Sequence, residues 1–203
     1  MTSTQAKPYI VGVDEAGRGP LAGPVTAAAV VLPVGFHSPQ IADSKKLSPK
    51  VRENLFEEIR NFSLAYSIIS VGPRRIEALN IREATRVAMG LAVERVFHQL
   101  SAAGHSPQLC VLVDGNMTAE TKHLQEPIIK GDQKITAIKA ASILAKVSRD
   151  RIMCTLDERY PGYGFSGHKG YPTKSHREAV ANNGPSAVHR RSFAGVKEFA
   201  QRR

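Results

Sequence analysis

The stretch YIVGVDEAGRG, residues 9–19, is an apolar run that ends in two adjacent acids, followed by two glycines and an arginine. Unpaired charge near a protein core is costly, so Asp14 and Glu15 at the end of a buried strand need a partner. A divalent cation is such a partner, because hard oxygen ligands suit Mg²⁺ and Mn²⁺. The glycines let a ligand approach the backbone, and Arg18 adds a planar cationic fork. The stretch predicts metal-assisted chemistry on a phosphate, although a lone Asp-Glu pair more often marks only a polar turn.

Two further acids lie in comparable places. Residues 109–113 form a second short apolar run that ends at Asp114, beside a glycine. In an open α/β sheet, ligands bind beyond the strand ends, so Asp14 and Asp114 are expected to converge if their strands are neighbours. Asp132 precedes a helical pattern, and its position alone is typical of a helix N-cap.

The hydrophobic periodicity predicts strands alternating with helices. Strands are expected at residues 9–14, 25–32, 64–71, 109–113 and 127–129. Helices are expected from Ser48-Pro49 to about residue 60, over 74–100 with a break near Asn80, over 137–153 and over 175–181. Residues 161–172, rich in Gly and Pro, are expected to form a loop. No linker separates two units, so we expect a single domain over residues 1–203, with residues 1–8 flexible.

Composition agrees with a globular nucleic-acid-binding chain. The chain has 203 residues, 42% of them hydrophobic, which is enough for one domain with a proper core and excludes general disorder. Its formal net charge is +10, and residues 130–203 hold 15 basic and 6 acidic residues, so most of that charge lies in the last third. A basic region beside an acidic metal site suits a polyanion that is held while it is cut.

The two cysteines, Cys110 and Cys154, lack the spacing of a zinc site or a disulfide framework, and we expect buried free thiols. The first residues lack a basic-then-apolar signal, and no apolar segment approaches the ~20 residues that span a bilayer. We therefore expect a cytoplasmic protein with no membrane association.

Eight sequence blocks follow one another along the chain. They are GVDEAGRGPLAGPV (12–25), DSKKLS (43–48), NI (80–81), VDGN (113–116), KGD (130–132), AASILAKVSRD (140–150), HKGY (168–171) and HRRSF (189–193). In this order they resemble the motifs of the ribonuclease HII family, and the resemblance covers essentially the whole chain from residue 9 onward. It implies an α/β, ribonuclease H-like fold: a mixed central β-sheet flanked by helices, with a basic helical C-terminal extension over about residues 155–203 that binds substrate.

The resemblance also implies an activity. It is that of an endoribonuclease that cleaves the RNA strand of RNA/DNA hybrids and incises 5′ of single ribonucleotides embedded in duplex DNA. The catalytic and metal-binding residues that it implies are Asp14, Glu15, Asp114 and Asp132. This assignment takes precedence over the N-cap interpretation of Asp132. The expected cofactor is Mn²⁺ or Mg²⁺, and two such ions ~3.5–4 Å apart would support water attack that leaves a 3′-hydroxyl and a 5′-phosphate.

The resemblance assigns recognition of the ribose 2′-hydroxyl to Gly17, Arg18 and Gly19, and packing against a sugar to Tyr171. An isolated tyrosine more often packs in a core or on a surface, but the glycine-rich setting beside Lys169 favours substrate contact here. Phosphate contacts are predicted at Lys45, Lys46, Ser142, Lys146 and Arg149. For each of these, a solvated surface position is an equally good interpretation.

Four further side chains and one acid receive weaker roles. Charge alone predicts that Arg190 and Arg191 bind the flanking duplex. His168 and His176 flank the glycine-rich loop and are expected to shape it, and Asp150 is expected to form a structural ion pair.

Three alternative functions share part of this sequence pattern. Ribonuclease HIII resembles this family but carries an extra N-terminal domain, whereas only eight residues precede the first strand here. A Holliday-junction resolvase would share the acids but would not need residues 17–19 for a sugar. A non-catalytic basic nucleic-acid-binding protein would have no use for acids at strand ends. We expect a monomer acting on RNA/DNA hybrids and on DNA duplexes containing ribonucleotides, and a sliding clamp stays open as a further partner.

Overall fold

The computed structural model describes residues 7–36, 38, 41 and 48–200. Its centre is a five-stranded mixed sheet in the order β3-β2-β1-β4-β5. The strands are β1 (Tyr9–Ala16), β2 (Val25–Val31), β3 (Ala65–Val71), β4 (Leu109–Asp114) and β5 (Leu124–Ile128). The central strand β1 is parallel to β4, which is parallel to β5, whereas β2 is antiparallel to both β1 and β3. The predicted mixed sheet is confirmed.

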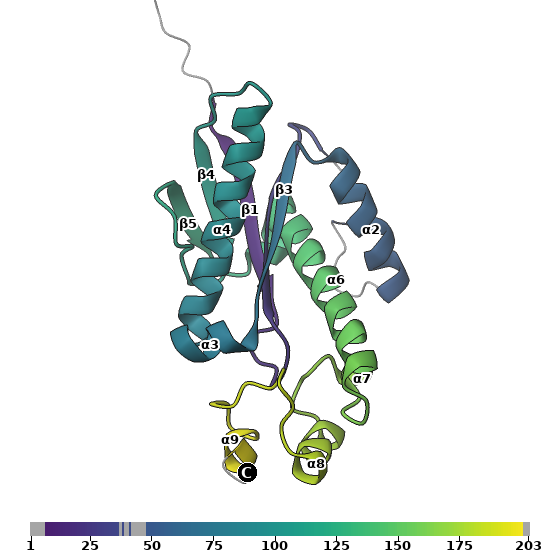
Figure 1. Ribbon diagram of the computed structural model, residues 1–203. Helices are drawn as coiled ribbons and strands as arrows, with labels where there is room; N and C mark the ends of the chain where they lie inside the picture. The colour runs from purple at the N-terminus through teal and green to yellow at the C-terminus, as the bar shows by residue number, and fades with distance from the viewer. Residues whose placement is uncertain (1–6, 37, 39–40, 42–47, 201–203) are drawn as a thin grey trace, which may run out of the picture.

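Helices cover both faces of the sheet (Figure 1). They are α2 (Pro49–Phe62), α3 (Pro73–Leu79), α4 (Ile81–Ala102), α5 (Gly131–Lys134), α6 (Thr136–Arg159), α7 (Phe165–His168), α8 (Lys174–Asn183) and α9 (Lys197–Ala200). Helix α4 lies on one face, and α6 with α2 lies on the other. The last three helices gather below the sheet in Figure 1, at the end towards which β1 runs. The C-terminal segment thus lies next to the end of β1 that carries the acids.

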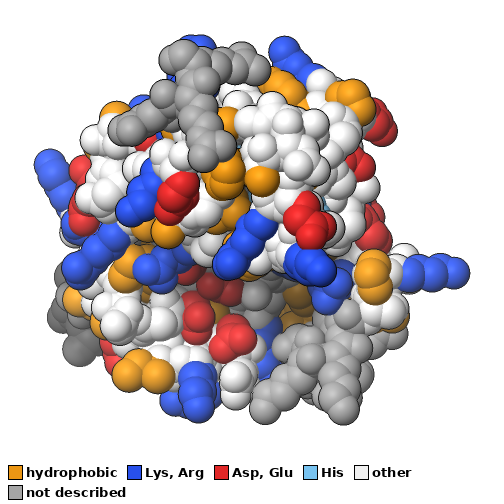
Figure 2. Space-filling view, turned by 90° about the horizontal axis from the view of Figure 1, so that it is seen from below, with side chains coloured by type: hydrophobic (Ala, Val, Ile, Leu, Met, Phe, Trp, Pro, Cys, Tyr) orange, Lys and Arg blue, Asp and Glu red, His pale blue; other side chains and the backbone are white. Residues whose placement is uncertain are grey.

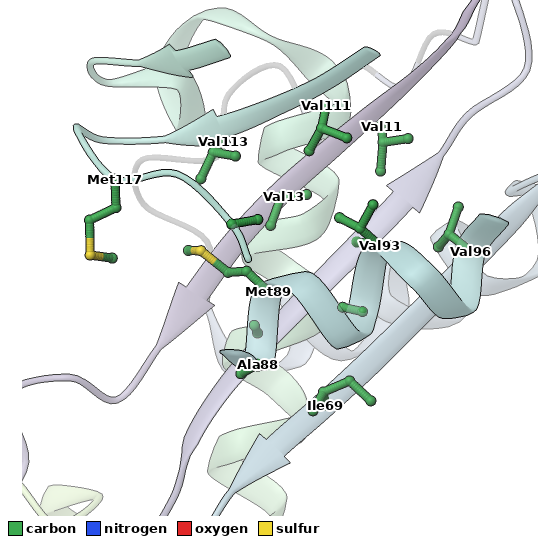
Figure 3. Packing of buried hydrophobic residues seen from close by; sticks show 14 of the residues in the cluster. Val11, Val13, Ile69, Ala88, Met89, Val93, Val96, Val111, Val113 and Met117 are labelled. Carbon is green, nitrogen blue, oxygen red and sulfur yellow. The ribbon is translucent and has the colours of Figure 1, made fainter. Parts of the chain in front are cut away.

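A well-packed apolar layer fixes β1 against β4 and α4. Val13 of β1 and Val113 of β4 are fully buried and share a cluster with Met89 and Val93 of α4 (Figure 3). Burying such side chains is the main stabilising contribution to a fold of this size, at about 1.5–3 kcal/mol each. The ends of β1 and β4 are therefore held rigidly with respect to one another.

Helix α6 packs unusually close to β1 on the opposite face. A Cβ atom on Gly12 would lie only 2.1 Å from the carbonyl carbon of Ala137, so only glycine fits there. The facing turns of α6 carry small buried residues, among them Ala140 and Ala141. This close contact sets α6 beside β1, so that side chains projecting from the helix reach the residues at the end of the strand.

The sequence predicted most of the elements, with differences at their ends. The break at Asn80 is confirmed: its φ is 66°, and its side chain accepts hydrogen bonds from the amides of Arg82 and Glu83. The N-cap at Ser48 is also confirmed. Strand β5 covers Leu124–Ile128 and not residues 127–129, and α6 continues six residues beyond Met153. The predicted loop over 161–172 contains the short helix α7.

Both cysteines are free, as expected, but Cys154 is exposed and Cys110 half-buried, so the predicted buried setting is wrong for Cys154. Cys154 lies in the last turns of α6. Across the described residues, the structure has no helix that is long and apolar enough to cross a membrane.

Candidate functional site

The ends of β1 and β4 bring two acids together. Val13 is in register with Val113, so Asp14 and Asp114 follow at neighbouring positions of adjacent parallel strands. Asp14 is only 6% exposed, and one of its carboxylate oxygens accepts a hydrogen bond from the amide of Glu15 at 2.7 Å. The predicted convergence of the two strand ends is confirmed.

Asp132 is attached to the same place through its backbone. Its amide donates a hydrogen bond to Oδ1 of Asp114 at 3.1 Å. The preceding Gly131 is buried, and a Cβ there would lie 2.5 Å from Cδ1 of Ile138 and 3.3 Å from Oδ1 of Asp114. Helix α6 has Ile135 as its N-cap residue, with no side-chain hydrogen bond. Asp132 is therefore not the cap of α6, and α5 carries it to the end of β4.

The acids at the strand ends affect one another's ionisation. Burial raises the pKa of Asp14 well above its ordinary value, and the charges of Glu15 and Asp114 raise it further. A hydrogen bond from the Ser142 hydroxyl on α6 partly offsets this effect. Burial also raises the pKa of Glu15, whereas the guanidinium of Arg18, 3.4 Å from Glu15, lowers it. The carboxylates are thus crowded and poorly solvated, and positive charge at this place would stabilise them.

This donor set fits a hard divalent cation, because all the groups are carboxylate oxygens and no Lys or Arg side chain among the described residues forms an ion pair with the buried Asp14. As they stand, the described residues contain no group of three His, Cys, Asp or Glu side chains arranged to hold a metal ion. Glu15 instead pairs with Arg18, and Asp114 accepts the Asp132 amide.

The loop after β1 lies beside these acids and contains the Gly-Arg-Gly loop, residues 17–19. Gly17 has a φ of 94°, and a Cβ there would lie 1.9 Å from Nε of Arg149, so the protein itself requires a glycine. At Gly19 a Cβ would have only the ring of Tyr171 within 4 Å, at 3.9 Å. Gly19 is thus open on its outer side, and Tyr171, 43% exposed, lies next to it. The structure brings the predicted sugar-recognition residues together.

Two buried arginines hold this loop from beneath. Arg149 is 1% exposed and donates to the carbonyl oxygens of Ala22, Pro24 and Lys169. Arg190 is 0% exposed and donates to carbonyl oxygens of the same loop. Neither guanidinium has surface left for a phosphate or a duplex, so the predicted phosphate contact of Arg149 and duplex contact of Arg190 are corrected to internal roles.

Three histidines shape the loop around Tyr171. His168 Nδ1 accepts from the amide of Gly170, and its Nε2 is 2.8 Å from the carbonyl oxygen of Tyr163. His176 Nδ1 lies 2.9 Å from the carbonyl oxygen of Tyr171, and its Nε2 is 3.1 Å from Nε2 of His189. The shaping role predicted for the first two is confirmed. His189 was missed, although it begins the HRRSF block.

The other residues predicted to contact phosphate have different surroundings in the structure. Ser142 points to Asp14, and Lys146 forms an ion pair with Asp150 at 2.7 Å, which confirms the ion-pair role of Asp150. Lys45 and Lys46 lie outside the described residues.

On the face seen from below, acidic side chains lie in a recess that Lys and Arg side chains border (Figure 2). This surface has the charge pattern expected for cation-assisted binding of a polyanion.

Comparison with known proteins gives a consistent result. The family model described as Ribonuclease HII matches residues 11–196. A curated relative, ribonuclease HII of Syntrophotalea carbinolica, is 47% identical over 197 residues, which cover 97% of this chain and 90% of that protein. The structure of ribonuclease H2 from Pyrococcus horikoshii is 25% identical with a TM-score of 0.72, covering 95% of this chain and 97% of that one. RNase HII from Archaeoglobus fulgidus, solved in a complex with PCNA, is 26% identical with a TM-score of 0.70, covering 92% of this chain and 95% of that one.

Proposed function

Because the chain belongs to the ribonuclease HII family, whose members are endonucleases that degrade RNA in RNA/DNA hybrids, we propose a finer activity for it. It incises the ribonucleotide-containing strand on the 5′ side of a ribonucleotide, and a single ribonucleotide embedded in duplex DNA is sufficient. The products carry a 3′-hydroxyl and a 5′-phosphate. The observation that carries this proposal is the position of Gly19 and Tyr171 beside the acid-bearing end of β1.

The acids have the role of cation ligands. Asp14, Glu15, Asp114 and Asp132 would hold Mn²⁺ or Mg²⁺, and the bound ions would supply an activated water and stabilise the leaving oxygen. The raised pKa of Asp14, caused first by burial and then by Glu15, supports this role, because a cation would relieve the cost of the charged form. The same observation opposes a non-catalytic binding protein, in which these acids would only repel phosphate.

The loop and Tyr171 select the sugar. The Gly-Arg-Gly loop presents its backbone to the ribose at the scissile junction, and the exposed ring of Tyr171 packs against a neighbouring sugar. A ribose differs from a deoxyribose by one hydroxyl that can both donate and accept a hydrogen bond. Backbone groups in a fixed loop recognise that hydroxyl without reference to base sequence, so the enzyme acts at ribonucleotides in any sequence context.

We propose that the protein acts as a monomer in the cytoplasm, with the hybrid or ribonucleotide-containing duplex as its partner. Its free cysteines suit a reducing compartment.

Cleavage assays on four substrates test the function: a long RNA/DNA hybrid, a DNA duplex with one ribonucleotide, the same duplex with a 2′-O-methyl group, and an all-DNA duplex. We expect metal-dependent cleavage of the first two and none of the last two. Cleavage of the all-DNA duplex would favour a structure-specific DNA nuclease, and binding without cleavage in Mn²⁺ or Mg²⁺ would favour the non-catalytic alternative.

A further inference from the structure

Arg190 contacts the Gly-Arg-Gly loop from a segment 172 residues further along the chain. Its Nη2 donates to the carbonyl oxygen of Gly17 at 2.6 Å, and its Nη1 donates to that of Arg18 at 2.8 Å. Its Nε and Nη2 both donate to the carbonyl oxygen of Gly23, at 3.1 and 3.0 Å. All three guanidinium nitrogens are thus engaged by backbone carbonyls of one loop. The fork geometry of arginine permits this, and a lysine ammonium cannot reproduce it.

These bonds determine where the loop amides point. The described residues contain no cis peptide bond, so the peptides between Gly17 and Arg18 and between Arg18 and Gly19 are trans. In a planar trans peptide the carbonyl and the following N–H point in opposite directions. Because the carbonyls of Gly17 and Arg18 point inward to Arg190, the amides of Arg18 and Gly19 point away from it. Gly19 lies beside Tyr171, so the outward side of the loop is the proposed sugar site.

The arrangement is expensive for stability. Arg190 and Arg149 are both buried, and neither takes part in an ion pair with any described acid. Burial, together with the charge of Arg149, lowers the pKa of Arg190 to about 9. Hydrogen bonds to backbone carbonyls offset this cost, because those carbonyls would otherwise be buried without a donor. The bonds of Arg190 therefore fix the conformation of the loop from which the carbonyls come.

We propose that Arg190 is the positioning residue for ribose recognition: it fixes the Gly-Arg-Gly loop with the amides of Arg18 and Gly19 directed at the 2′-oxygen of the substrate. This inference rests on the proposed function and adds that the C-terminal segment, through one buried side chain, sets the preference for ribose over deoxyribose. The exposed side chains of the C-terminal segment do not set this preference. Ser192, two residues on, is anchored to Glu77 of α3 by its amide and hydroxyl, which ties this segment to the main body of the fold.

The test compares Arg190→Lys with Arg191→Lys, the same substitution at its exposed neighbour. Both substitutions are made in the Asp14→Asn background, so that binding is measured without cleavage. For each protein, the ratio of Kd for an all-DNA duplex to Kd for the same duplex with one ribonucleotide is measured. Arg190→Lys should reduce this ratio about tenfold, as expected for misdirected hydrogen bonds, with little change in Kd for the all-DNA duplex. Arg191→Lys should keep the parent ratio, whatever its effect on overall affinity.

The possible results distinguish a failure of the positioning role of Arg190 from a failure of the proposed function. A parent ratio above one that survives Arg190→Lys overturns the positioning role and leaves the proposed function standing. Equal loss of affinity for both duplexes also overturns it, because that is the result of a merely structural role. A parent protein with no preference for the ribonucleotide contradicts the proposed function itself and the inference with it.

A second measurement needs no variant at position 190 and decides the matter if Arg190→Lys does not fold. In ¹⁵N NMR spectra of the Asp14→Asn protein, the amide signals of Arg18 and Gly19 should shift with the ribonucleotide duplex and much less with the all-DNA duplex. The guanidinium protons of Arg190 should stay protected from solvent exchange in both complexes. Equal amide shifts with both duplexes would overturn the proposal.

Discussion

The backbone amide of Asp132 donates a hydrogen bond to the carboxylate of Asp114, 18 residues earlier in the chain, at 3.1 Å. The bond attaches α5 to the end of β4 through the backbone of Asp132. It brings Asp132 close to Asp114 and leaves the Asp132 carboxylate out of the attachment. The Asp132 carboxylate can therefore be neutralised without disrupting the hydrogen bond that positions it.

The first prediction concerns the acids. Asp14→Asn, Asp114→Asn and Asp132→Asn should each lower the cleavage rate about a thousandfold or more while the circular dichroism spectrum stays unchanged, because each keeps its shape and loses the ligand charge. Glu158→Gln, at an exposed acid near the end of α6, is the matched control and should keep the rate of the parent protein. Parent-like turnover in all three aspartate variants would remove the acids from the mechanism.

A thermal measurement on Asp14→Asn isolates the cost of the buried charge. Burial and neighbouring acids raise the pKa of Asp14, so the charged form destabilises the metal-free fold at neutral pH. An asparagine keeps an oxygen that can accept the Glu15 amide and removes that charge. The melting temperature of the Asp14→Asn variant without metal should be a few degrees above that of the parent protein. Added Mn²⁺ should stabilise the variant less than the parent protein. A lower melting temperature without metal would contradict this account.

Tyr171 is predicted to act on sugar placement and not on duplex affinity. Tyr171→Ala should reduce cleavage at a single ribonucleotide more than it weakens binding to all-DNA duplex, since duplex binding rests on phosphate contacts. Tyr171→Phe keeps the ring beside Gly19 and should retain most of the activity. Steady-state kinetics and gel-shift titrations on the same proteins measure both effects. Equal losses in cleavage and in duplex affinity for Tyr171→Ala would contradict a role in sugar placement.

The exposed basic residues of the C-terminal segment should set the salt dependence of binding. Removing this segment by ending the chain near residue 186 would also remove the buried Arg190, so point substitutions are the cleaner test. Lys174→Gln, Arg177→Gln and Arg191→Gln should each flatten the slope of log K against log salt by up to about 0.9 for each phosphate that the variant no longer neutralises. Arg95→Gln, at an exposed position of α4, is the control. Unchanged slopes in all three would show that the duplex docks elsewhere.

The fold and the site differ in how far the sequence predicted them. The strand ends at Asp14 and Asp114 were visible as apolar runs stopped by acids, and the close contact of Gly12 with α6 enforces the arrangement that those runs suggested. Charged residue types predict exposed side chains, and this prediction is wrong for two arginines. Arg149 and Arg190 have nothing in their local sequence to distinguish them from surface arginines. Their burial depends on backbone carbonyls 125 residues away in the chain for the first and 167 for the second.

His189 gives a pH-dependent prediction. Its Nδ1 accepts from the amide of Ser186, so in the neutral ring Nε2 carries the proton and faces Nε2 of His176, whose Nδ1 then donates to the carbonyl of Tyr171. Protonation of His189 breaks this series of hydrogen bonds, because its Nδ1 can then no longer accept from the Ser186 amide. Burial, with the charge of His176, lowers the pKa of His189 from 6.5 to about 4. The unfolded state therefore binds the proton more readily, and stability is full above about pH 6.5 and falls as pH drops towards 4.

Near-UV circular dichroism during thermal unfolding between pH 7 and pH 4 measures this effect, because Tyr163 packs against His189 with ring centroids 5.0 Å apart. The parent protein should lose this signal at progressively lower temperature as the pH falls. His189→Gln, which cannot titrate, should show a weaker pH dependence over the same range. An identical pH dependence in the two proteins would assign the acid sensitivity to other groups.

The position of the cut and the chemistry of the product ends distinguish hydrolysis by water from attack by the 2′-hydroxyl. An end-labelled DNA duplex with one ribonucleotide is incubated with Mn²⁺ or Mg²⁺ and mapped on a sequencing gel. We expect one cut on the 5′ side of the ribonucleotide, a 3′-hydroxyl on the upstream product and a 5′-phosphorylated ribonucleotide on the downstream one. A cyclic phosphate would mean that the 2′-hydroxyl is the nucleophile, and would contradict its assignment as the group that the Gly-Arg-Gly loop recognises. A cut on the 3′ side would contradict the predicted position of the scissile bond.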